Sequence, residues 1–425
     1  MAKLGPWTAI AAAPAFAACS SGGGNDTPPP PRQNVAPTVS ISAPSSATEA
    51  ATVTLSAAES RDPDGSIATF TWRQTDGPAA RLTGDLTAEV SVQAPLVPQA
   101  SDLTFQVTAT DNEGASTTAS VVLTVDPAPR PSILEFVTVF DGRERAYTVY
   151  TPQTFVADQP AVMVLHGGNG NMRDVFEPAR PTQRWIELAD QDGLLIISPN
   201  GYSEVRQDGL GEEQSWADIR DDQSGLISMQ DDEGFLLQVL DVVREGRGHD
   251  PQRVLVTGSS NGGMMTFRML VNQGDRFAAG ASFIGGMPEQ FVPLPPTATP
   301  VMILAGTDDP LVLFEGGIVA GRSAPTRSIP DTVEYWLDAS LADRSTQVTT
   351  TLPDTTDDDC LIDETTWTTA SGTPAVSYYQ MNGGGHIAPD TTPSLRAPFF
   401  FDRLGNQCSD AHGIDLAYAF FRSVP

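Results

Sequence analysis

The sequence predicts two folded parts, an all-β sandwich of the immunoglobulin type followed by a doubly wound α/β domain. Within residues 35–126, short alternating strand-like runs are separated by turn signals, as in a β-sandwich. Across residues 133–425, apolar strand-like runs alternate with helical stretches, which is typical of a doubly wound α/β sheet. The proline-rich residues 127–132 separate the two patterns, so we expect them to form a linker.

The sandwich prediction rests on runs of β-branched and apolar residues, which are Thr38–Ile41, Thr52–Leu55, Ile67–Trp72, Val90–Val92, Leu103–Thr108 and Ser120–Val125. Two acidic turn clusters, Asp62–Gly65 and Asp111–Gly114, lie between such runs. Their carboxylates could ligate Ca²⁺, but no calcium loop of the twelve-residue kind is present, so hydrogen-bonded Asx turns are the favoured interpretation. In Ser60–Gly65, Phe70–Trp72 and Val107–Gly114 this region resembles the polycystin-type (PKD) modules of secreted bacterial enzymes. That resemblance implies a spacer or a polymer-binding accessory.

The α/β prediction rests on the second set of runs, which are Ala161–Leu165, Arg184–Asp190, Leu194–Ser198, Phe235–Arg244, Arg253–Thr257, Met264–Val271, Ala279–Ile284, Val301–Ala305, Thr332–Asp338, Val376–Met381 and Leu416–Phe421. In doubly wound sheets, chemistry gathers at the carboxyl ends of the strands. We therefore search for catalytic residues in the loops that follow the predicted strands.

The charge balance limits the partners. The chain has 53 acidic and 24 basic residues and a formal net charge of −29, which would repel nucleic acid and anionic lipid head groups. With 40% hydrophobic residues the chain can build an ordinary core without metal or disulfide staples. We expect no nucleic-acid partner, no metal site and no cofactor, and the sequence carries no signal for an oligomeric state.

The N-terminus predicts export. Residues 1–18 read as a signal peptide, and Phe16–Cys19 resembles a lipobox whose cysteine is lipidated and becomes the mature N-terminus. A plain cleaved signal is the alternative, because Pro6 and Pro14 interrupt the apolar run. Residues 19–34, rich in glycine and then proline, are expected to tether the folded parts. The predicted location is extracellular or on the cell envelope, with a lipid anchor at Cys19 as the contact with a bacterial membrane surface.

Export also explains the cysteine count. The chain has three cysteines, Cys19, Cys360 and Cys408. A secreted protein can form disulfides, so with Cys19 lipidated we expect Cys360 to pair with Cys408.

A nucleophile elbow is the central functional motif. Gly258–Gly262 reads Gly-Ser-Ser-Asn-Gly and fits the GxSxG pattern, in which a sharp strand-to-helix turn exposes the serine hydroxyl. The strand-like Arg253–Thr257 precedes it and the helix-like Met264–Val271 follows it, which favours the elbow over a chance match. Ser260 is therefore the predicted nucleophile.

A serine nucleophile needs a base and an acid that orients the base. Among four histidines, only His386 follows a predicted strand downstream of Ser260, as the α/β-hydrolase order Ser, Asp, His requires. His166 precedes the serine, His249 is expected in a solvent-facing turn, and His412 lies in a polar stretch before the last helix. For the acid, the strand-like Val301–Ala305 leads into Asp308 and Asp309, and residue chemistry leaves both open.

Two backbone N–H groups should stabilise the oxyanion. We expect one from Asn261, directly after the nucleophile, and one from Gly168 in the loop His166–Gly168. His166 is then a loop-shaping residue rather than a second base. Trp216 is a candidate substrate-binding side chain for the acyl pocket, and a buried structural tryptophan is an equal alternative.

From Pro131 onward the chain resembles the bacterial poly(3-hydroxybutyrate) depolymerase-like esterases, an α/β-hydrolase branch close to feruloyl and acetylxylan esterases. The matching segments are Leu165–Gly168, Asp231–Phe235, Asp250–Val254, Thr257–Met265, Phe277–Ala279, Gly306–Pro310, Glu315–Gly317 and Gly384–His386. The resemblance implies Ser260, Asp309 and His386 as the catalytic triad, which resolves the choice between the two aspartates. Ile387–Asp390 and Ala305 depart from the family pattern beside the expected acyl pocket, so they bear on the substrate.

The resulting prediction is an exported serine carboxylic ester hydrolase that forms an acyl-enzyme at Ser260. Its first expected substrate is a hydroxyalkanoate polyester or its oligomers, and the alternative is a feruloyl or acetyl ester of plant polysaccharide. A hypothesis of another class is a surface-tethered, polymer-binding lipoprotein without catalysis.

Overall fold

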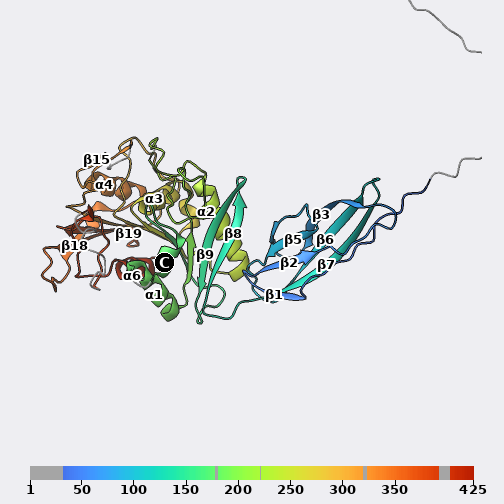
Figure 1. Ribbon diagram of the computed structural model, residues 1–425. Coiled ribbons are helices and arrows are strands. Elements are labelled where there is room, and N and C mark those ends of the chain that lie inside the picture. The colour runs from blue at the N-terminus through green and yellow to red at the C-terminus, as the bar shows by residue number, and fades with distance from the viewer. Residues whose placement is uncertain (1–31, 178–179, 221, 319–322, 392–402) are drawn as a thin grey trace, which may run out of the picture.

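The computed structural model describes residues 32–177, 180–220, 222–318, 323–391 and 403–425. The predicted signal peptide, Cys19 and most of the tether lie outside these residues. Figure 1 shows an elongated β-module beside a larger α/β domain, and the combination of a β-sandwich with a doubly wound sheet is confirmed. No helix within the described ranges is long and apolar enough to cross a membrane.

The β-module packs two sheets face to face. One has the order β1-β7-β6-β3 and the other β2-β5-β4. Their bounds are β1 Ser46–Thr48, β2 Thr52–Ser56, β3 Ile67–Asp76, β4 Arg81–Thr83, β5 Glu89–Gln93, β6 Ser101–Asp111 and β7 Ser116–Asp126. Alternate residues along β6, such as Leu103, Phe105 and Val107, point into a core that also holds Trp72. This alternation is what a half-buried strand requires.

The α/β domain is built on a ten-stranded sheet of order β17-β18-β19-β14-β13-β12-β10-β11-β9-β8. The neighbouring strands β19, β14, β13, β12, β10 and β11 in the middle of the sheet are parallel. The strands at both edges, β17 and β18 on one side and β9 and β8 on the other, pair in antiparallel fashion. Their bounds are β8 Ser132–Phe140, β9 Arg143–Thr151, β10 Ala161–Leu165, β11 Leu195–Pro199, β12 Val254–Ser259, β13 Ala279–Phe283, β14 Val301–Gly306, β17 Val348–Thr351, β18 Leu361–Thr368 and β19 Pro374–Asn382. A separate small hairpin pairs β15 Gly317–Ile318 with β16 Pro325–Thr326. The first strand of the large sheet thus starts at Ser132, the last residue of the predicted linker.

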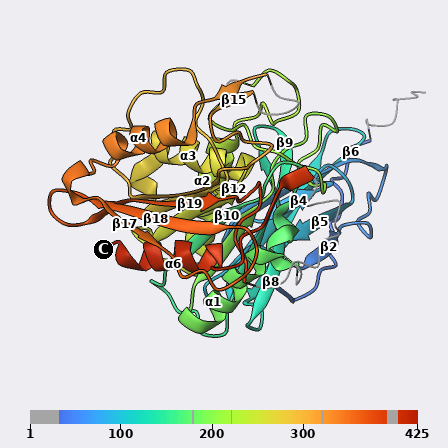
Figure 2. The ribbon, with the colours of Figure 1, turned by 90° about the vertical axis from the view of Figure 1, so that its left-hand side faces the viewer.

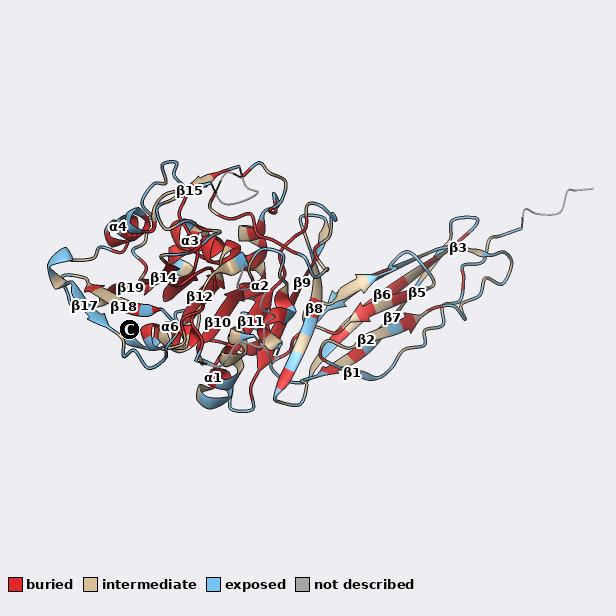
Figure 3. Cartoon of the chain, turned by 60° about the vertical axis from the view of Figure 1, so that its left-hand side comes forward, coloured by how far each residue is buried: buried red, intermediate tan, exposed pale blue. Residues whose placement is uncertain are grey.

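Helices cover both faces of this sheet. The longer helices are α1 Arg184–Asp192, α2 Asp232–Arg247, α3 Asn261–Gln273, α4 Ile329–Ala339 and α6 Gly413–Ser423, and single 3-10 turns are η1 Met172–Phe176, η2 Pro181–Gln183, η3 Gly274–Arg276 and η4 Arg344–Thr346. Figure 2 shows α2, α3 and α4 on one side of the sheet and α1 and α6 on the other. Along β10, Met163 packs with the first group and Val162 with the second, because successive strand side chains point to opposite faces. Figure 3 shows the resulting buried central strands.

The parallel strands bring the predicted site together. β10 leads into His166–Gly168, β12 into Ser260, β14 into Asp309 and β19 into the loop with His386. Carboxyl ends of parallel strands meet at one edge of a sheet, so these four loops converge there.

Side-chain contacts join the β-module to the α/β domain. Arg247, at the end of α2, forms a bidentate ion pair with Glu49 at N–O distances of 2.6 and 2.9 Å, and both side chains are buried. Glu49 also accepts N–H bonds from Val97 in the module and Ala128 in the linker. On β5, Gln93 contacts the backbone of β8. The Glu49 carboxylate therefore joins the β-module, the linker and helix α2.

Cys360 and Cys408 form a disulfide with a Cα–Cα distance of 5.4 Å. It joins the residue before β18 to the segment that precedes α6. The edge strand β17 lies outside every run that the sequence predicts as a strand, because its residues Val348–Thr351 are all exposed and carry no core-facing alternation.

Candidate active site

Ser260 lies in the sharp turn between β12 and α3 with φ 56° and ψ −118°, a conformation that costs a non-glycine residue about 1–3 kcal/mol. Its N–H donates to the Phe283 carbonyl at 2.8 Å, which ties the turn to the neighbouring strand. A Cβ at Gly262 would lie 2.4 Å from the carbonyl oxygens of Leu165 and His166. The last glycine of the motif is therefore required by the close approach of the elbow to the loop after β10.

His386 joins Ser260 to Asp309. Its Nε2 lies 2.8 Å from Ser260 Oγ, and its Nδ1 lies 2.7 Å from Asp309 Oδ2. The other carboxylate oxygen of Asp309 accepts the backbone N–H groups of Leu311 and Val312, each at 2.8 Å. The alternative acid, Asp308, instead has its carboxylate within 3.0 Å of the Thr307 hydroxyl. The structure thus brings Asp309, and not Asp308, to the histidine.

The loop that carries His386 is held by its backbone. The N–H of Gly385 donates to the Asn406 carbonyl at 2.8 Å, and the N–H of His386 donates to the Leu404 carbonyl at 2.5 Å. A Cβ built on Gly384 would lie 2.9 Å from Cys408 Sγ. The disulfide therefore lies directly against the loop that positions the imidazole.

Two backbone N–H groups in the segments next to Ser260, those of Asn261 and Gly168, have no acceptor among the residues described. Asn261 is the first residue of α3, and first-turn N–H groups have no acceptor within their own helix. Asn169 N–H is used by the Gln214 carbonyl and Gly170 N–H by the Gly167 carbonyl, whereas Gly168 N–H has no acceptor among the residues described. A Cβ at Gly167 would lie 3.8 Å from Ser260 Cβ, which puts this loop against the nucleophile. Asn261 and Gly168 are thus free to donate to an oxyanion.

His166 supports the loop His166–Gly168 after β10, which we call the oxyanion loop, and it does not contact Ser260 as a base would. Its Nδ1 lies 2.8 Å from the Gly167 carbonyl, and its Nε2 accepts the Gly201 N–H at 3.0 Å, so the ring is the neutral Nδ1–H tautomer. Burial lowers the pKa of His166 from 6.5 to about 4, and the hydrogen bond to Gly167 opposes this shift in part. At neutral pH the ring is therefore a fixed, uncharged spacer.

Trp216 corrects the expectation of a substrate-binding side chain. Its side chain is 0% exposed. It does not line the pocket near Asn169 that is described below. Its indole N–H donates to the His166 carbonyl at 2.9 Å, and its ring centroid lies 4.8 Å from that of His166. The bulk of the indole fills the space beneath the oxyanion loop, so the structural alternative holds.

The two remaining histidines are structural as well. His249 was expected in a solvent-facing turn, and this is wrong, because its side chain is buried; burial, helped by Arg244, lowers its pKa from 6.5 to about 4. His412 caps α6 by accepting the Ile414 N–H at 3.2 Å, and its Nε2 lies 3.6 Å from Asp390. Neither approaches Ser260 through any contact among the described residues.

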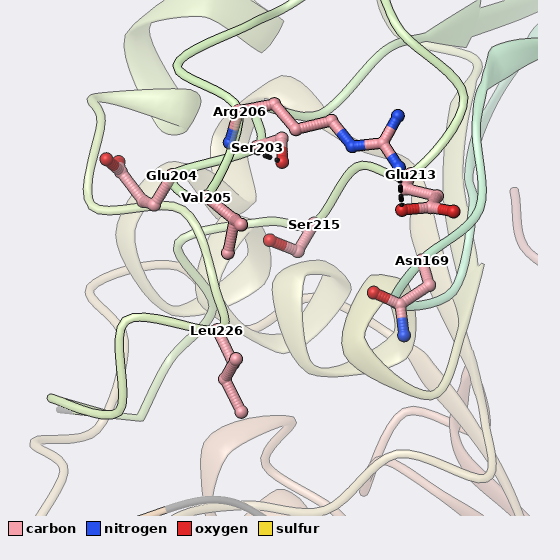
Figure 4. A pocket seen from close by; sticks show the side chains of 8 residues that line it. All are labelled: Asn169, Ser203, Glu204, Val205, Arg206, Glu213, Ser215 and Leu226. Carbon is pink, nitrogen blue, oxygen red and sulfur yellow. Dashed lines mark hydrogen bonds and ion pairs between the residues drawn. The ribbon is translucent and has the colours of Figure 1, made fainter.

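A small pocket lies next to the oxyanion loop, and the sequence did not predict it. Its volume is about 160 Å³, and it is lined by Asn169, Ser203, Glu204, Val205, Arg206, Glu213, Ser215 and Leu226. Figure 4 shows the Arg206–Glu213 ion pair at one end of the pocket and Leu226 at the other. Asn169 directly follows Gly168, and Ser215 directly precedes Trp216. The lining comes from loops without periodic patterning, so only their position next to the oxyanion loop could have pointed to it.

Within the described ranges, no group of three or more His, Cys, Asp or Glu side chains is arranged to hold a metal ion. The Asp111 carboxylate in the β-module instead accepts the backbone N–H groups of Glu113 and Ala115, as in an Asx turn. These bonds agree with the Asx-turn interpretation of this cluster.

Comparisons with known proteins agree with this architecture. Residues 43–125 match a PKD domain family, and residues 202–287, which include the elbow, match the prolyl oligopeptidase family. NocK of Nocardia uniformis subsp. tsuyamanensis, named as an esterase, is 28% identical over 267 residues, which is 60% of this chain and 73% of that protein. The acetylxylan esterase of Coprinopsis cinerea is 33% identical over 141 residues, 32% of this chain and 34% of that protein.

The bifunctional acetylxylan esterase/xylanase of Neocallimastix patriciarum is 25% identical over 179 residues, which cover 41% of this chain and 23% of that protein. Among solved structures, the acetyl xylan esterase from Aspergillus awamori aligns with a TM-score of 0.42 at 15% identity, over 64% of this chain and 98% of that one. Together with the elbow and the α/β sheet, the sequence relatives identify the chain as a serine carboxylic ester hydrolase of the α/β-hydrolase fold, preceded by a β-module that matches a PKD domain family.

Proposed function

We propose that this serine esterase works through a triad of Ser260, His386 and Asp309. The observation that carries the proposal is the continuous hydrogen-bonded chain from Asp309 through His386 to Ser260, with distances of 2.7 and 2.8 Å. Such spacing lets the imidazole take a proton from the hydroxyl while the carboxylate fixes the ring and stabilises the imidazolium that forms.

The reaction has two halves. Ser260 Oγ attacks the ester carbonyl carbon while its proton passes to His386 Nε2, and the oxyanion accepts the N–H groups of Asn261 and Gly168. The bond to the leaving alcohol then breaks as His386 returns the proton to the alcohol oxygen. Water attacks the acyl-enzyme with His386 again as base, and collapse of the second intermediate releases the acid and restores Ser260.

Mutation of Ser260 or His386 to alanine tests this mechanism. Each change should lower kcat on p-nitrophenyl butyrate by roughly 10⁴–10⁶-fold, because the triad acts as a unit. A fluorophosphonate probe should label folded wild-type protein at Ser260 and leave Ser260→Ala unlabelled. Undiminished esterase activity in Ser260→Ala would end the proposal, and absence of a wild-type adduct would favour the non-catalytic polymer-binding lipoprotein.

For the substrate, we propose an acyl ester of a polysaccharide in place of the polyester expected first. The pocket next to the oxyanion loop has six polar or charged lining residues and two apolar ones, Val205 and Leu226. Hydroxyl groups of a sugar can bond to such a lining, whereas a hydroxyalkanoate chain offers few donors. Two of the sequence relatives are also named as acetylxylan esterases.

A substrate panel separates the two classes. Acetylated xylo-oligosaccharides, methyl ferulate, p-nitrophenyl butyrate and hydroxybutyrate oligomers are compared by kcat/KM. The proposal predicts that kcat/KM on a carbohydrate ester is at least about tenfold higher than on the hydroxybutyrate oligomers. One well-placed hydrogen bond supplies a preference of this size. A preference of that size for the oligomers would restore the polyester assignment, and the variant Arg206→Gln should lower kcat/KM on the carbohydrate ester alone.

Export and lipidation complete the proposal, and they rest on the pattern of residues 1–18 and on Cys19. Expressed in a bacterium with a lipoprotein pathway, the full chain should partition with membranes and gain the mass of a lipidated Cys19. A Cys19→Ser chain should be soluble or uncleaved. Wild-type protein that is released without lipid would instead identify a plain cleaved signal.

A further inference from the structure

Asn261 is held by its side chain as well as by its place in α3. Its Oδ1 accepts the backbone N–H of Trp216 at 2.7 Å, and its Nδ2 donates to the Trp216 carbonyl at 3.1 Å and to Asp218 Oδ2 at 2.6 Å. The side-chain oxygen and both amide hydrogens are thus used, and the residue is buried. These bonds fix the residue whose backbone N–H is the proposed first donor to the oxyanion.

Trp216 links the two segments that carry the oxyanion donors. Its backbone bonds to Asn261, and its indole N–H bonds to the carbonyl of His166, two residues before Gly168. A shift of either segment would therefore stretch a buried hydrogen bond to the same tryptophan. The distance between the two donors depends on this bridge.

Asp218 anchors the bridge with a charge. Its carboxylate bonds to Arg220 through Nη2 at 2.5 Å and Nε at 3.0 Å, and the two side chains are 0% and 2% exposed. Burial of an ion pair costs several kcal/mol per ion, so the pair is weak evidence for stability alone. A charged acceptor, however, makes a shorter and roughly twice as strong hydrogen bond to the Asn261 amide. Arg220 also balances the carboxylate charge, which would otherwise oppose a developing oxyanion nearby.

We propose that Asp218 and Trp216 are positioning residues for the oxyanion hole. They hold Asn261 through its side chain, so that its N–H and that of Gly168 are already in place when the tetrahedral intermediate forms. Neither residue touches the substrate. The inference rests on the proposed triad mechanism and adds to it the groups that fix the geometry of the oxyanion site.

Asn261→Ala tests the inference directly, because it removes the side-chain contacts and keeps the backbone N–H. We expect kcat to fall by roughly 10–100-fold with KM changed less than about threefold, since the loss acts on the transition state. The matched control is Asn272→Ala on the same helix, whose amide bonds to Glu233 at the surface; it should keep the wild-type kcat.

A second readout separates positioning from general loosening. Replacing the ester C=O by C=S weakens the acceptor at the oxyanion position, so the wild-type enzyme should strongly prefer the oxygen ester. In Asn261→Ala this oxygen-over-sulfur ratio of kcat/KM should drop at least about tenfold. Asp218→Asn should show the same trend, and Asp218→Asn with Arg220→Gln provides a neutral pair where the single variant fails to fold.

Wild-type kcat and an unchanged oxygen-over-sulfur ratio in folded Asn261→Ala would overturn the inference. A lower melting temperature with an unchanged ratio would assign Asn261 a structural role only. Both results leave the triad intact, whereas activity in Ser260→Ala would overturn the proposed function itself.

Discussion

Asp309 is held on both of its oxygens, one by His386 and the other by the N–H groups of Leu311 and Val312. These three contacts fix the orientation of the carboxylate. Its neighbour Asp308 is bonded, within the described ranges, only to the Thr307 hydroxyl and to backbone. The same substitution can therefore be compared at Asp308 and Asp309, which differ in position but not in side-chain chemistry.

We predict that Asp309→Asn lowers kcat by roughly 10³–10⁴-fold, because an amide can hold the wrong imidazole tautomer. Asp308→Asn should stay within about threefold of wild type, since the effect of a surface change is small. Steady-state kinetics on p-nitrophenyl butyrate provide the comparison. Equal losses in the two variants would contradict the assignment of the acid.

The neutral buried histidines predict a pH dependence of stability. Burial lowers the pKa of His166 and His249 to about 4, whereas the unfolded chain titrates near 6.5. Between these values the unfolded state binds more protons, so the free energy of unfolding should fall as pH drops from about 6.5 to 4, by roughly 2 kcal/mol per histidine at pH 5. Urea unfolding at pH 7 and pH 5 measures the difference, and His249→Gln should shrink it. The same difference in that variant would refute the prediction for His249.

The residues that the structure brings together could be predicted where a local pattern carries the information. The glycines around Ser260 and the glycine-rich loop before His386 are visible in short motifs, because the required backbone geometry is local. Trp216 and His249 could not be placed this way. Their burial depends on segments far along the chain, such as the contact between Trp216 and His166, 50 residues apart.

At the scale of elements, the disulfide supports the loop that carries His386, the proposed catalytic base. The backbone bonds that hold Gly385 and His386 come from Leu404 and Asn406, close to Cys408. The double variant Cys360→Ser with Cys408→Ser should lose about 2–4 kcal/mol of unfolding free energy, as expected for closure of a loop of this length.

The same double variant should also lose activity before it unfolds, because the His386 loop has lost part of its support. Urea unfolding and activity are measured together, with and without reductant. Wild-type protein should respond to the reductant and the double variant should not. A response of equal size in both would show that the reductant acts elsewhere.

Many buried central strands were predictable from their apolar runs, whereas the antiparallel strands β8, β9, β17 and β18 lie outside every predicted run. Ala161–Leu165 was predicted as a strand and is β10, because a short apolar run with β-branched residues suits a buried parallel strand. The pocket-forming residues 203–215 lie in turns and bridges whose form depends on their partners. Residues 203–215, which we propose to contact the substrate, are therefore the part of the site that was hardest to predict from the sequence.

At the scale of the whole molecule, Glu49 couples module and catalytic domain across 198 residues of chain. Glu49→Gln leaves Arg247 buried without its counter-charge, which should cost about 3–5 kcal/mol. The control Arg81→Gln breaks the partly exposed pair with Glu144 between the same two parts and should cost under about 1 kcal/mol. Thermal unfolding by calorimetry measures both, and equal losses would contradict the central role of the buried pair.

This coupling could not be predicted from sequence. A proline-rich linker such as 127–132 is compatible with independent domains, and composition says nothing about whether a glutamate on one side meets an arginine on the other. The bond from Ala128 N–H to Glu49 makes the linker part of the contact. We expect calorimetry of the wild-type chain to show one transition for module and catalytic domain, and two separate transitions would contradict this.

The bond between Cys360 and Cys408 encloses His386 in a covalent ring, since the two cysteines are 48 residues apart and the histidine lies between them. The turn Thr369–Gly372 belongs to the same ring and is largely exposed. Proteases cut preferentially at such exposed turns. A single cut there would leave both new ends attached to the molecule, with the paired strands β18 and β19 still side by side. A protease cut at this turn should thus leave His386 attached to the rest of the molecule.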